Sequence, residues 1–116
     1  MNWEYLTEAS QLDELTEKSS KNPILIFKHS TSCSISHTAL NRLERNWDLE
    51  KENDSRIFLL DLLRYRNISN EIAQRFNVYH QSPQVLVIAN GKAVYDASHF
   101  DINYKDIKNH LQLVEG

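Results

Sequence analysis

The chain has 116 residues, of which 41% are hydrophobic and 25% are charged, so we expect one soluble domain over residues 1–116 with its own core. The formal net charge of -3 gives no reason to expect nucleic acid or an acidic membrane surface as a partner. No apolar stretch approaches the roughly 18 residues of a membrane-spanning helix.

The cysteine content and the N-terminal residues bear on the compartment. Cys33 is the single cysteine of the chain, so no internal disulfide can form and nothing indicates an oxidising compartment. The residues from Met1 to Glu4 lack the basic start and apolar run of a signal peptide. The cytoplasm is therefore the expected location.

The N-terminal part of the chain shows helix and strand patterns. Leu12 and Leu15 share one face of an otherwise acidic and polar segment, which predicts a helix capped by Thr7 or Ser10. Pro23 ends this helix, and a short continuous apolar run follows, as in a strand covered on both faces. The expected elements are a candidate short strand around Trp3–Leu6, a helix over Thr7–Ser19 and a strand over Ile24–Phe27.

Apolar spacing and turn residues predict the remaining elements. Apolar residues recur at helical intervals in three further segments, and short apolar runs between them are typical of buried strands. Asn90-Gly91 is the strongest signal for a two-residue hairpin turn. The charged stretch Arg42–Arg56 is interpreted as a solvated helix face and a loop. The expected helices cover Ser34–Leu49, Asn67–Phe76 (with Asn67 as its cap) and the chain from about Asn103, and the expected strands cover Ile57–Leu60, Val85–Ala89 and Lys92–Tyr95.

This order of elements predicts an α/β fold. Helices between strands imply right-handed crossovers and a mainly parallel sheet covered on both faces, with the Asn90-Gly91 hairpin at one edge. The expected core is a central mixed sheet of about four strands. Functional groups gather at the carboxyl ends of strands in such sheets. Cys33 follows the Ile24–Phe27 strand and opens the next helix, so it lies where function is expected.

The surroundings of Cys33 favour a reactive thiol. A helix N-terminus presents unpaired backbone N–H groups and the positive end of the helix dipole, and both favour the thiolate. Lys28, His29 and His37 are close in sequence and would add positive potential. Small hydroxyl residues that surround the cysteine, support the thiolate and leave space for a disulfide are Thr31, Ser32, Ser34 and Ser36. We therefore expect Cys33 to be the catalytic nucleophile.

Two other interpretations of Cys33 remain open. A free cysteine is commonly a small buried hydrophobic residue with no chemistry. Cys33 and His37 are also four residues apart, a usable pair of metal ligands on a helix, and His29 is a candidate third ligand. Because no second cysteine or acidic cluster completes such a site, no metal is expected.

Ser82-Pro83 is the second marker of a site. Proline cannot donate a ladder hydrogen bond, so it belongs at the first position of a strand or at an edge. A cis peptide here would expose the backbone of Ser82 to an extended substrate, whereas a trans proline would simply begin the Val85–Ala89 strand. The roles of His37, His80 and His99 stay open.

These motifs together resemble a known family. A strand, then Cys33-x-x-Ser36, then a helix, with Ser82-Pro83 before a hairpin, resembles the thioredoxin-like fold across nearly the whole chain. The stretches that resemble the monothiol bacilliredoxins of the YtxJ type are Phe27–Ser36 (FKHSTSCSIS), His80–Gln84 (HQSPQ), Arg66–Ser69 and Ser98-His99.

The resemblance implies thiol–disulfide exchange with bacillithiol, a low-molecular-weight thiol that many Gram-positive bacteria use in place of glutathione. Cys33 would take bacillithiol from S-bacillithiolated client proteins as a mixed disulfide, and bacillithiol or an external reductase would release it. Ser82, Pro83 and His29 would bind the substrate. Bacillithiol is then a co-substrate, and no bound cofactor is expected.

The chain departs from related proteins at a few positions. Ser36 stands where a dithiol enzyme has its second cysteine, so it is expected to donate a hydrogen bond to the thiolate or to help cap the helix. Much of the bacilliredoxin family would have proline at the position of Ser34. Many thioredoxin-like proteins have glycine where this chain has Ser98 and His99.

Rival functions fit parts of the same sequence. A redox enzyme with another low-molecular-weight thiol, including an arsenate-reductase-like role, would use the same cysteine, although no arginine set flanks Cys33 for arsenate. A non-catalytic adaptor would bind a partner through Ser82-Pro83 and leave Cys33 incidental. A cluster-binding monothiol glutaredoxin would have glycine and phenylalanine where this chain has Ser34 and Ile35. The alkylation rate of Cys33 separates the enzymes from the adaptor, whose thiol should react no faster than a free cysteine.

Overall fold

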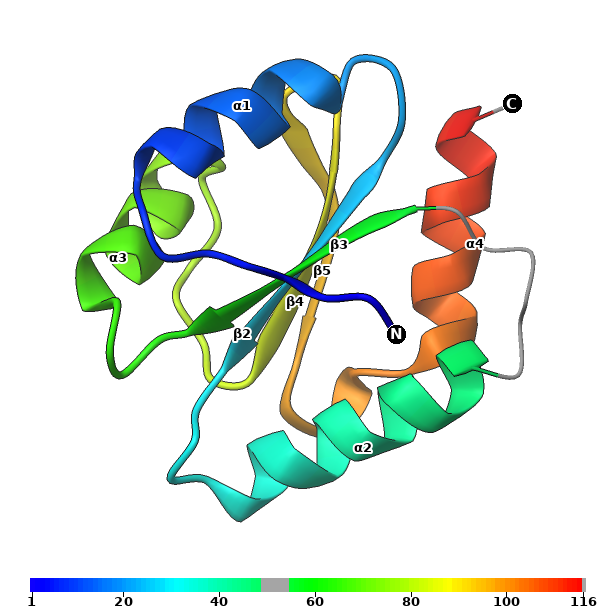
Figure 1. The fold of residues 1–116 in the computed structure, drawn as a ribbon. Coiled ribbons are helices and arrows are strands. Elements are labelled where there is room, and N and C mark those ends of the chain that lie inside the picture. Colours follow the sequence, from blue (N-terminus) through cyan, green and yellow to red (C-terminus); the bar gives the residue numbers. More distant parts are fainter. Residues whose placement is uncertain (49–54, 116) are drawn as a thin grey trace.

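The computed structural model describes residues 1–48 and 55–115 and shows a five-stranded sheet between two pairs of helices (Figure 1). The strands are β1 (Glu4–Tyr5), β2 (Ile24–His29), β3 (Arg56–Asp61), β4 (Gln84–Ala89) and β5 (Lys92–Ser98). The helices are α1 (Ser10–Lys18), α2 (Ser34–Asp48), α3 (Arg66–Arg75), the short η1 (His99–Asp101) and α4 (Tyr104–Glu115). This arrangement confirms the predicted α/β class with a mixed sheet, and the candidate first strand is present as β1.

Each face of the sheet has its own apolar core, because successive strand side chains point to opposite faces. In β2, Ile24 and Ile26 pack with the core beneath α1 and α3, whereas Leu25 and Phe27 pack with the core beneath α2 and α4. The predicted inward residues of α1, Leu12 and Leu15, are fully buried. The sheet is therefore covered by a separate apolar core on each face.

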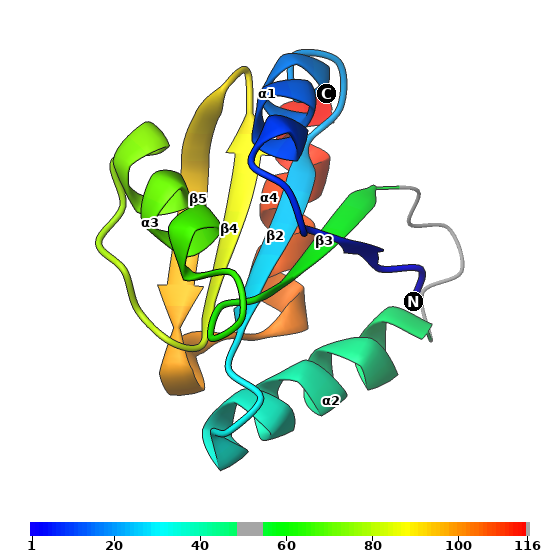
Figure 2. The same ribbon diagram turned by 60° about the vertical axis from the view of Figure 1, so that its left-hand side comes forward.

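The strand order is β1-β3-β2-β4-β5, with β1 lying along β3 at one edge (Figure 2). β1 and β2 both run parallel to β3, whereas β4 runs antiparallel to both β2 and β5. The expectation of a mainly parallel sheet was therefore wrong at β4. The physical reason is the loop of residues 76–83, which runs back along α3 and returns the chain to the end of the sheet where β3 finished (Figure 1).

The predicted hairpin is present between β4 and β5. Asn90 and Gly91 have φ values of 52° and 73°, and two successive positive φ values are those of a type I′ turn. β5 continues three residues past the predicted end at Tyr95. Its pairing shifts register, since Val87 faces Tyr95 but Ile88 faces Ala93, so one residue of β5 bulges out of the ladder.

The predicted helix caps were only partly right. Neither Thr7 nor Ser10 caps α1; the side chain of Gln11 instead accepts hydrogen bonds from the N–H groups of Thr7 and Glu8, at 2.8 and 2.9 Å. Asn67 does not cap α3, because that helix begins one residue earlier. Asn103 directly precedes α4 and caps it, because its side-chain oxygen accepts a hydrogen bond from the N–H of Asp106 at 2.9 Å.

β2 is two residues longer than predicted, because Lys28 and His29 continue the strand and are buried. The predicted end of the second helix at Leu49, and most of the loop predicted within the charged stretch, lie outside the described residues. Within residues 1–48 and 55–115, no helix is both long enough and apolar enough to cross a membrane.

Candidate functional site

Cys33 lies between the carboxyl end of β2 and the first turn of α2. Its backbone N–H donates to the carbonyl of Ser30 at 3.2 Å, and its carbonyl accepts from the N–H of His37, also at 3.2 Å. Because this last bond is the first of the helix, Cys33 occupies the position that directly precedes the first helical residue. The cysteine residue is partly exposed.

The hydroxyl residues around Cys33 divide into two groups. Thr31, Ser32 and Ser34 are exposed. Ser36 is fully buried, and its hydroxyl lies 2.6 Å from Nδ1 of His29 and accepts a hydrogen bond from the N–H of Ser30 at 3.0 Å. Ser36 therefore ties the first turn of α2 to the end of β2. The support of the thiolate by these residues stays a prediction, and for Ser36 it would require the hydroxyl to turn away from His29.

His29 and His37 form an edge-to-face pair beside this junction. Their ring centroids are 4.7 Å apart at an angle of 87°, and Nε2 of His37 lies 2.9 Å from the carbonyl oxygen of Thr31. Burial lowers the pKa of His29, as does the charge of His37, while Asp61 and Glu44 act in the opposite direction. His29 is therefore a mostly neutral, buried ring, and its predicted contact with substrate stays a prediction.

The third interpretation of Cys33 was a metal site shared with His37 and His29. In the part of the chain that the structure describes, no three side chains of histidine, cysteine, aspartate or glutamate converge as a metal centre would need. The rings of His29 and His37 instead contact Ser36 and the carbonyl of Thr31.

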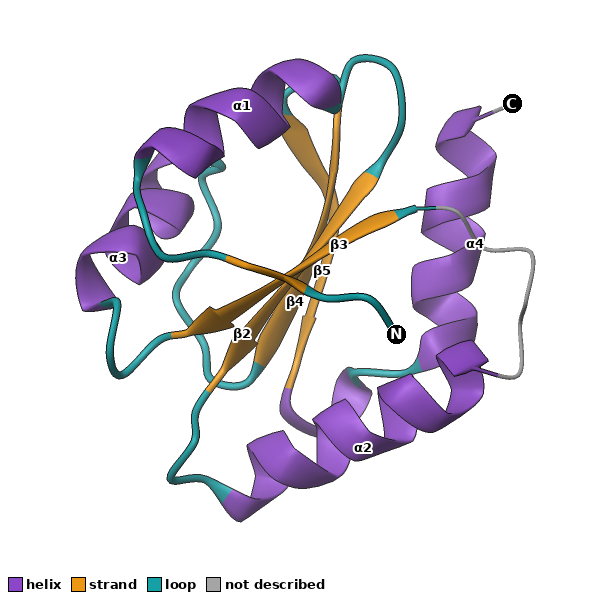
Figure 3. Ribbon diagram, in the orientation of Figure 1, coloured by secondary structure: helices purple, strands orange, loops and turns teal. Residues whose placement is uncertain are grey.

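Ser82-Pro83 directly precedes β4, the strand that pairs with β2, and its peptide bond is cis. Lys28 pairs with Gln84 across the antiparallel ladder between β2 and β4. Pro83 precedes Gln84 by one residue, so it lies beside the end of β2 from which the chain continues to Cys33. The carbonyl of Pro83 accepts a hydrogen bond from the N–H of His99 at 3.1 Å. The predicted substrate-binding residues therefore lie at the same end of the sheet as the cysteine, where the loops after β2 and β3 also gather (Figure 3).

Sequence reasoning assigned Lys28 only a general positive potential, but the structure makes it the centre of a second polar cluster, in which Lys28 and Gln84 are buried and His80 is exposed. Lys28 is fully buried; its Nζ lies 2.7 Å from Nδ1 of His80 and donates to Oε1 of Gln84 at 3.2 Å. Gln84 in turn donates to the carbonyl of Tyr79 at 2.9 Å. Burial lowers the pKa of Lys28 from 10.5 to about 8. A charged residue directly after an apolar strand run was the available signal for this cluster.

His80 and His99, whose roles the sequence left open, both flank the Ser82-Pro83 loop. His80 contacts Lys28 and also lies 3.3 Å from the hydroxyl of Ser69. Burial lowers the pKa of His80, and the charges of Lys28 and Arg66 act in the same direction. His99 is exposed and has a φ of 55°, a left-handed conformation that glycine adopts more easily. This explains why related folds are expected to have glycine there.

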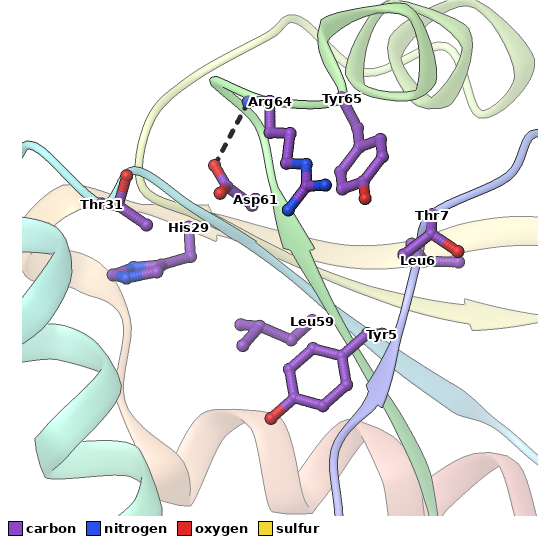
Figure 4. A pocket seen from close by; sticks show the side chains of 9 residues that line it. All are labelled: Tyr5, Leu6, Thr7, His29, Thr31, Leu59, Asp61, Arg64 and Tyr65. Carbon is purple, nitrogen blue, oxygen red and sulfur yellow. Dashed lines mark hydrogen bonds between the residues drawn. The ribbon is translucent and has the colours of Figure 1, made fainter.

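A pocket that the sequence did not predict lies on the other side of β2, between β1, β3 and the turn after β3 (Figure 4). It has a volume of about 340 Å³. Thr31 and His29 line it, together with Tyr5, Leu6, Thr7, Leu59, Asp61, Arg64 and Tyr65. Residues far apart in sequence build this pocket, so only the pairing of β1 with β3 brings its walls together.

Comparisons with known proteins agree with this geometry. The family model of monothiol bacilliredoxin BrxC matches residues 4–107. A solved structure described as a putative oxidoreductase with a thioredoxin fold is 28% identical, covers 90% of this chain and 89% of its own, and has a TM-score of 0.78. Reduced thioredoxin from Schistosoma mansoni is 17% identical, with 95% of each chain covered and a TM-score of 0.67. Thioredoxin from Malassezia sympodialis is 12% identical, with 99% and 92% covered and a TM-score of 0.72. The last two similarities concern the fold alone.

Proposed function

The chain belongs to the monothiol bacilliredoxin family, and we propose that it removes bacillithiol from S-bacillithiolated proteins in the cytoplasm through a mixed disulfide at Cys33. Family and fold support a thiol–disulfide redox function in general. The observation that carries the finer assignment is the partly exposed Cys33 at the start of α2, with Ser82-Pro83 alongside it.

The first step transfers bacillithiol from the client to the enzyme. The thiolate of Cys33 attacks the bacillithiol sulfur of the client's mixed disulfide. A new S–S bond forms between Cys33 and bacillithiol, and the old S–S bond breaks. The client cysteine leaves as a thiolate that takes up a proton, so the client is reduced and Cys33 is oxidised by the same two electrons.

The second step regenerates Cys33. A bacillithiol thiolate attacks the bacillithiol sulfur of the adduct, so that bacillithiol disulfide forms and the Cys33 thiolate leaves. An external reductase with a reactive thiol can supply the electrons instead. Ser36 stands three residues after Cys33, and a serine hydroxyl cannot form a disulfide. The resolving thiol must therefore come from outside the chain.

The backbone next to Pro83 suits an extended client segment. Within residues 1–48 and 55–115, the N–H and C=O groups of Ser82 have no hydrogen-bond partner, whereas the carbonyl of Pro83 is held by His99. Free backbone groups beside a nucleophile can pair with a substrate chain by strand addition. This supports Ser82 and Pro83 as the client-binding residues.

A test uses a small S-bacillithiolated client protein and follows the intact masses of client and enzyme. The wild-type protein is expected to remove one bacillithiol from the client and to gain it on Cys33, while the Cys33→Ser variant leaves the client unchanged. The same client carrying glutathione is the matched substrate control, and it should react more slowly.

Three results would contradict the proposal in different ways. Equal or faster removal of glutathione would assign a different low-molecular-weight thiol. An unchanged client, together with alkylation of Cys33 no faster than that of a free cysteine, would favour the non-catalytic adaptor. A coloured, iron-containing protein as purified would favour the cluster-binding alternative.

A further inference from the structure

We propose that the pocket between β1, β3 and the turn after β3 binds the part of the low-molecular-weight thiol that lies beyond its sulfur, with Arg64 and Asp61 as the charged contacts. The inference rests on the proposed thiol exchange at Cys33 and names the site for its small co-substrate. The ligand class is a low-molecular-weight thiol that carries both a carboxylate and an ammonium group.

The position of the pocket relative to Cys33 is the first argument. Thr31 lines the pocket and precedes Cys33 by two residues, and two residues of chain span at most about 7 Å. His29, also on the wall, pairs with Asp61 in the parallel ladder between β2 and β3. A small molecule disulfide-bonded to Cys33 can therefore reach the pocket past Thr31.

The two sides of β2 give the client and the small thiol separate approaches. β2 has β3 on one side and β4 on the other. Pro83 directly precedes β4 and so lies on the β4 side of β2, whereas the pocket lies on the β3 side. During exchange the three sulfurs line up, with Cys33 and the client cysteine at the two ends. The remainder of the small thiol must leave that line sideways, and the pocket offers a place for it that the client chain does not occupy.

The size and lining of the pocket suit a small organic molecule. Its volume of about 340 Å³ lies within the range of about 300–1,000 Å³ of ligand sites. Leu59 and the rings of Tyr5 and Tyr65 form apolar walls around the charged groups (Figure 4). Tyr5 is 64% exposed, a large apolar surface that a bound molecule would cover.

The charges of the pocket indicate the ligand class. The guanidinium of Arg64 enters the pocket alongside the ring of Tyr65 (Figure 4), 5.3 Å from its centroid. In the described part of the chain, no carboxylate lies within ion-pair distance of Arg64. Asp61 uses one carboxylate oxygen to accept from the N–H groups of Leu63 and Arg64, at 3.2 and 3.3 Å. A cation and an anion thus line one pocket without pairing to each other.

A ligand with both kinds of charge satisfies this arrangement. The fork of a guanidinium matches a carboxylate in a bidentate contact, and the second oxygen of Asp61 can accept from an ammonium group. A thiol compound built on cysteine with a free amino group and a carboxylate elsewhere in the molecule has both. An uncharged thiol would use neither contact.

The first experiment measures binding without redox chemistry. Reduced bacillithiol is titrated into the Cys33→Ser protein, and backbone amide signals are followed by NMR. The expected shifts fall on Thr31, Leu59 and Arg64, and the Arg64→Ala change should weaken binding about tenfold, as expected for loss of one charge-assisted contact of about 1.4 kcal/mol. Shifts confined to Ser82–Gln84, equal affinity in the Arg64→Ala protein, or no shifts at all would overturn the pocket assignment.

The second experiment measures the rate of Cys33 modification by two disulfides. Bacillithiol disulfide carries charged groups, whereas bis(2-hydroxyethyl) disulfide carries none. Arg64→Ala and Asp61→Asn should slow only the reaction of Cys33 with the charged reagent. Asparagine at position 61 keeps a side-chain oxygen that can accept from the N–H groups of Leu63 and Arg64. Arg42→Ala removes an exposed cation of α2 and is the matched control, expected to change neither rate. Equal slowing of both reagents, or slowing by Arg42→Ala as large as that by Arg64→Ala, would contradict the inference.

The two failures are distinguishable. If bacillithiol binds the pocket in the NMR titration but the wild-type protein does not remove it from the client, the proposed function fails and the binding site stands. If the client is freed normally but the shifts lie beside Ser82, the pocket assignment fails and the proposed function stands.

Discussion

Lys28 and His29 are buried neighbours at the end of β2, yet they belong to two different polar clusters. Lys28 points to the α1 and α3 face and contacts His80 and Gln84, whereas His29 points to the α2 face and contacts Ser36. The first cluster holds the loop that carries Ser82-Pro83, and the second holds the start of the helix that carries Cys33. One strand end therefore positions the Ser82-Pro83 loop, the proposed client site, with one residue and the loop of Cys33, the proposed nucleophile, with the next.

The difference between the two clusters lies in their chemistry. The Lys28 cluster buries a group that is costly to bury in its charged form, so its pKa is lowered to about 8. The His29 cluster buries a neutral ring whose partners are a hydroxyl and another imidazole. Most buried polar groups in proteins are hydrogen-bonded, because an unpaired one is costly. Such pairing fixes the geometry of both loops, as the proposed exchange at Cys33 would require.

Lys28→Ala tests the client side of this comparison and should have the largest effect. The change leaves a cavity and removes the donor to Gln84 and His80, so the free energy of unfolding should fall by about 3 kcal/mol. Urea unfolding measures this loss. The KM for a client should rise while the alkylation rate of Cys33 stays unchanged.

Lys28→Met is the matched control for Lys28→Ala. It keeps the buried stem and loses only the amine, so its cost should be about 1 kcal/mol. An altered alkylation rate in either variant would show that the two clusters are not independent.

Ser36→Ala tests the nucleophile side. The change removes the contact with His29 and leaves the N–H of Ser30 without its acceptor, so stability should fall by about 2 kcal/mol. Here the alkylation rate of Cys33 should change several-fold while the KM for a client does not. Ser34→Ala removes an exposed hydroxyl from the same turn and should leave the free energy of unfolding almost unchanged. If the losses of unfolding free energy caused by Ser36→Ala and by Lys28→Met do not add in the double variant, the two clusters are coupled.

The pH dependence of stability sharpens the comparison further. The folded protein releases the proton of Lys28 near pH 8, whereas the unfolded chain holds it until about 10.5, so stability should rise with pH in this window. The gain should be about 1–2 kcal/mol between pH 7 and pH 9.5, and Lys28→Met should lack it.

The acid side behaves differently, because both clusters contain a histidine with a lowered pKa, His29 in one and His80 in the other. Unfolded histidine takes up a proton near pH 6.5 while the folded rings resist it, so stability should fall as the pH drops below this value. His29→Gln and His80→Gln should each remove part of that fall in urea unfolding measured between pH 5 and pH 7. A pH profile that neither variant changes would contradict this assignment.

His99→Gly is the smallest expected effect and concerns the loop beside Pro83. The residue has a φ of 55°, so glycine should relieve the left-handed conformation and raise stability by about 0.5 kcal/mol. Ser98→Gly is the control, since Ser98 is extended with a φ of -139° and should lose stability. A loss in the His99→Gly protein, seen in thermal unfolding, would mean that the imidazole has a contact of its own.

The sequence predicted those parts of the fold that local pattern determines. The run Ile24–Phe27, the helical spacing of Leu12 and Leu15, and Asn90-Gly91 each identify their element from a few residues. Lys28 and His29 were missed as strand residues because their burial depends on polar contacts with distant partners. The partner of Lys28 is 52 residues away and that of His29 is seven residues away. No local pattern contains those partners.

The candidate site shows the same division. The position of Cys33 at the start of a helix follows from adjacent residues, and so does Pro83 at the start of a strand. The direction of β4 depends on the return path of the loop 76–83, and the pocket depends on Tyr5 meeting Leu59 across the sheet. These features arise from long-range pairing, which one sequence does not reveal.

The bulge in β5 has a consequence for how the protein meets other chains. β5 is an edge strand of the sheet, and an edge strand with regular unpaired N–H and C=O groups is a template for aggregation. The register shift breaks that regularity, and Lys92 and Asp96 add exposed charges along the strand. An unfolded segment of an oxidised protein therefore finds no continuous edge to extend there. The register shift and the exposed charges of β5 thus protect this edge of the sheet from pairing with unfolded chains of other proteins.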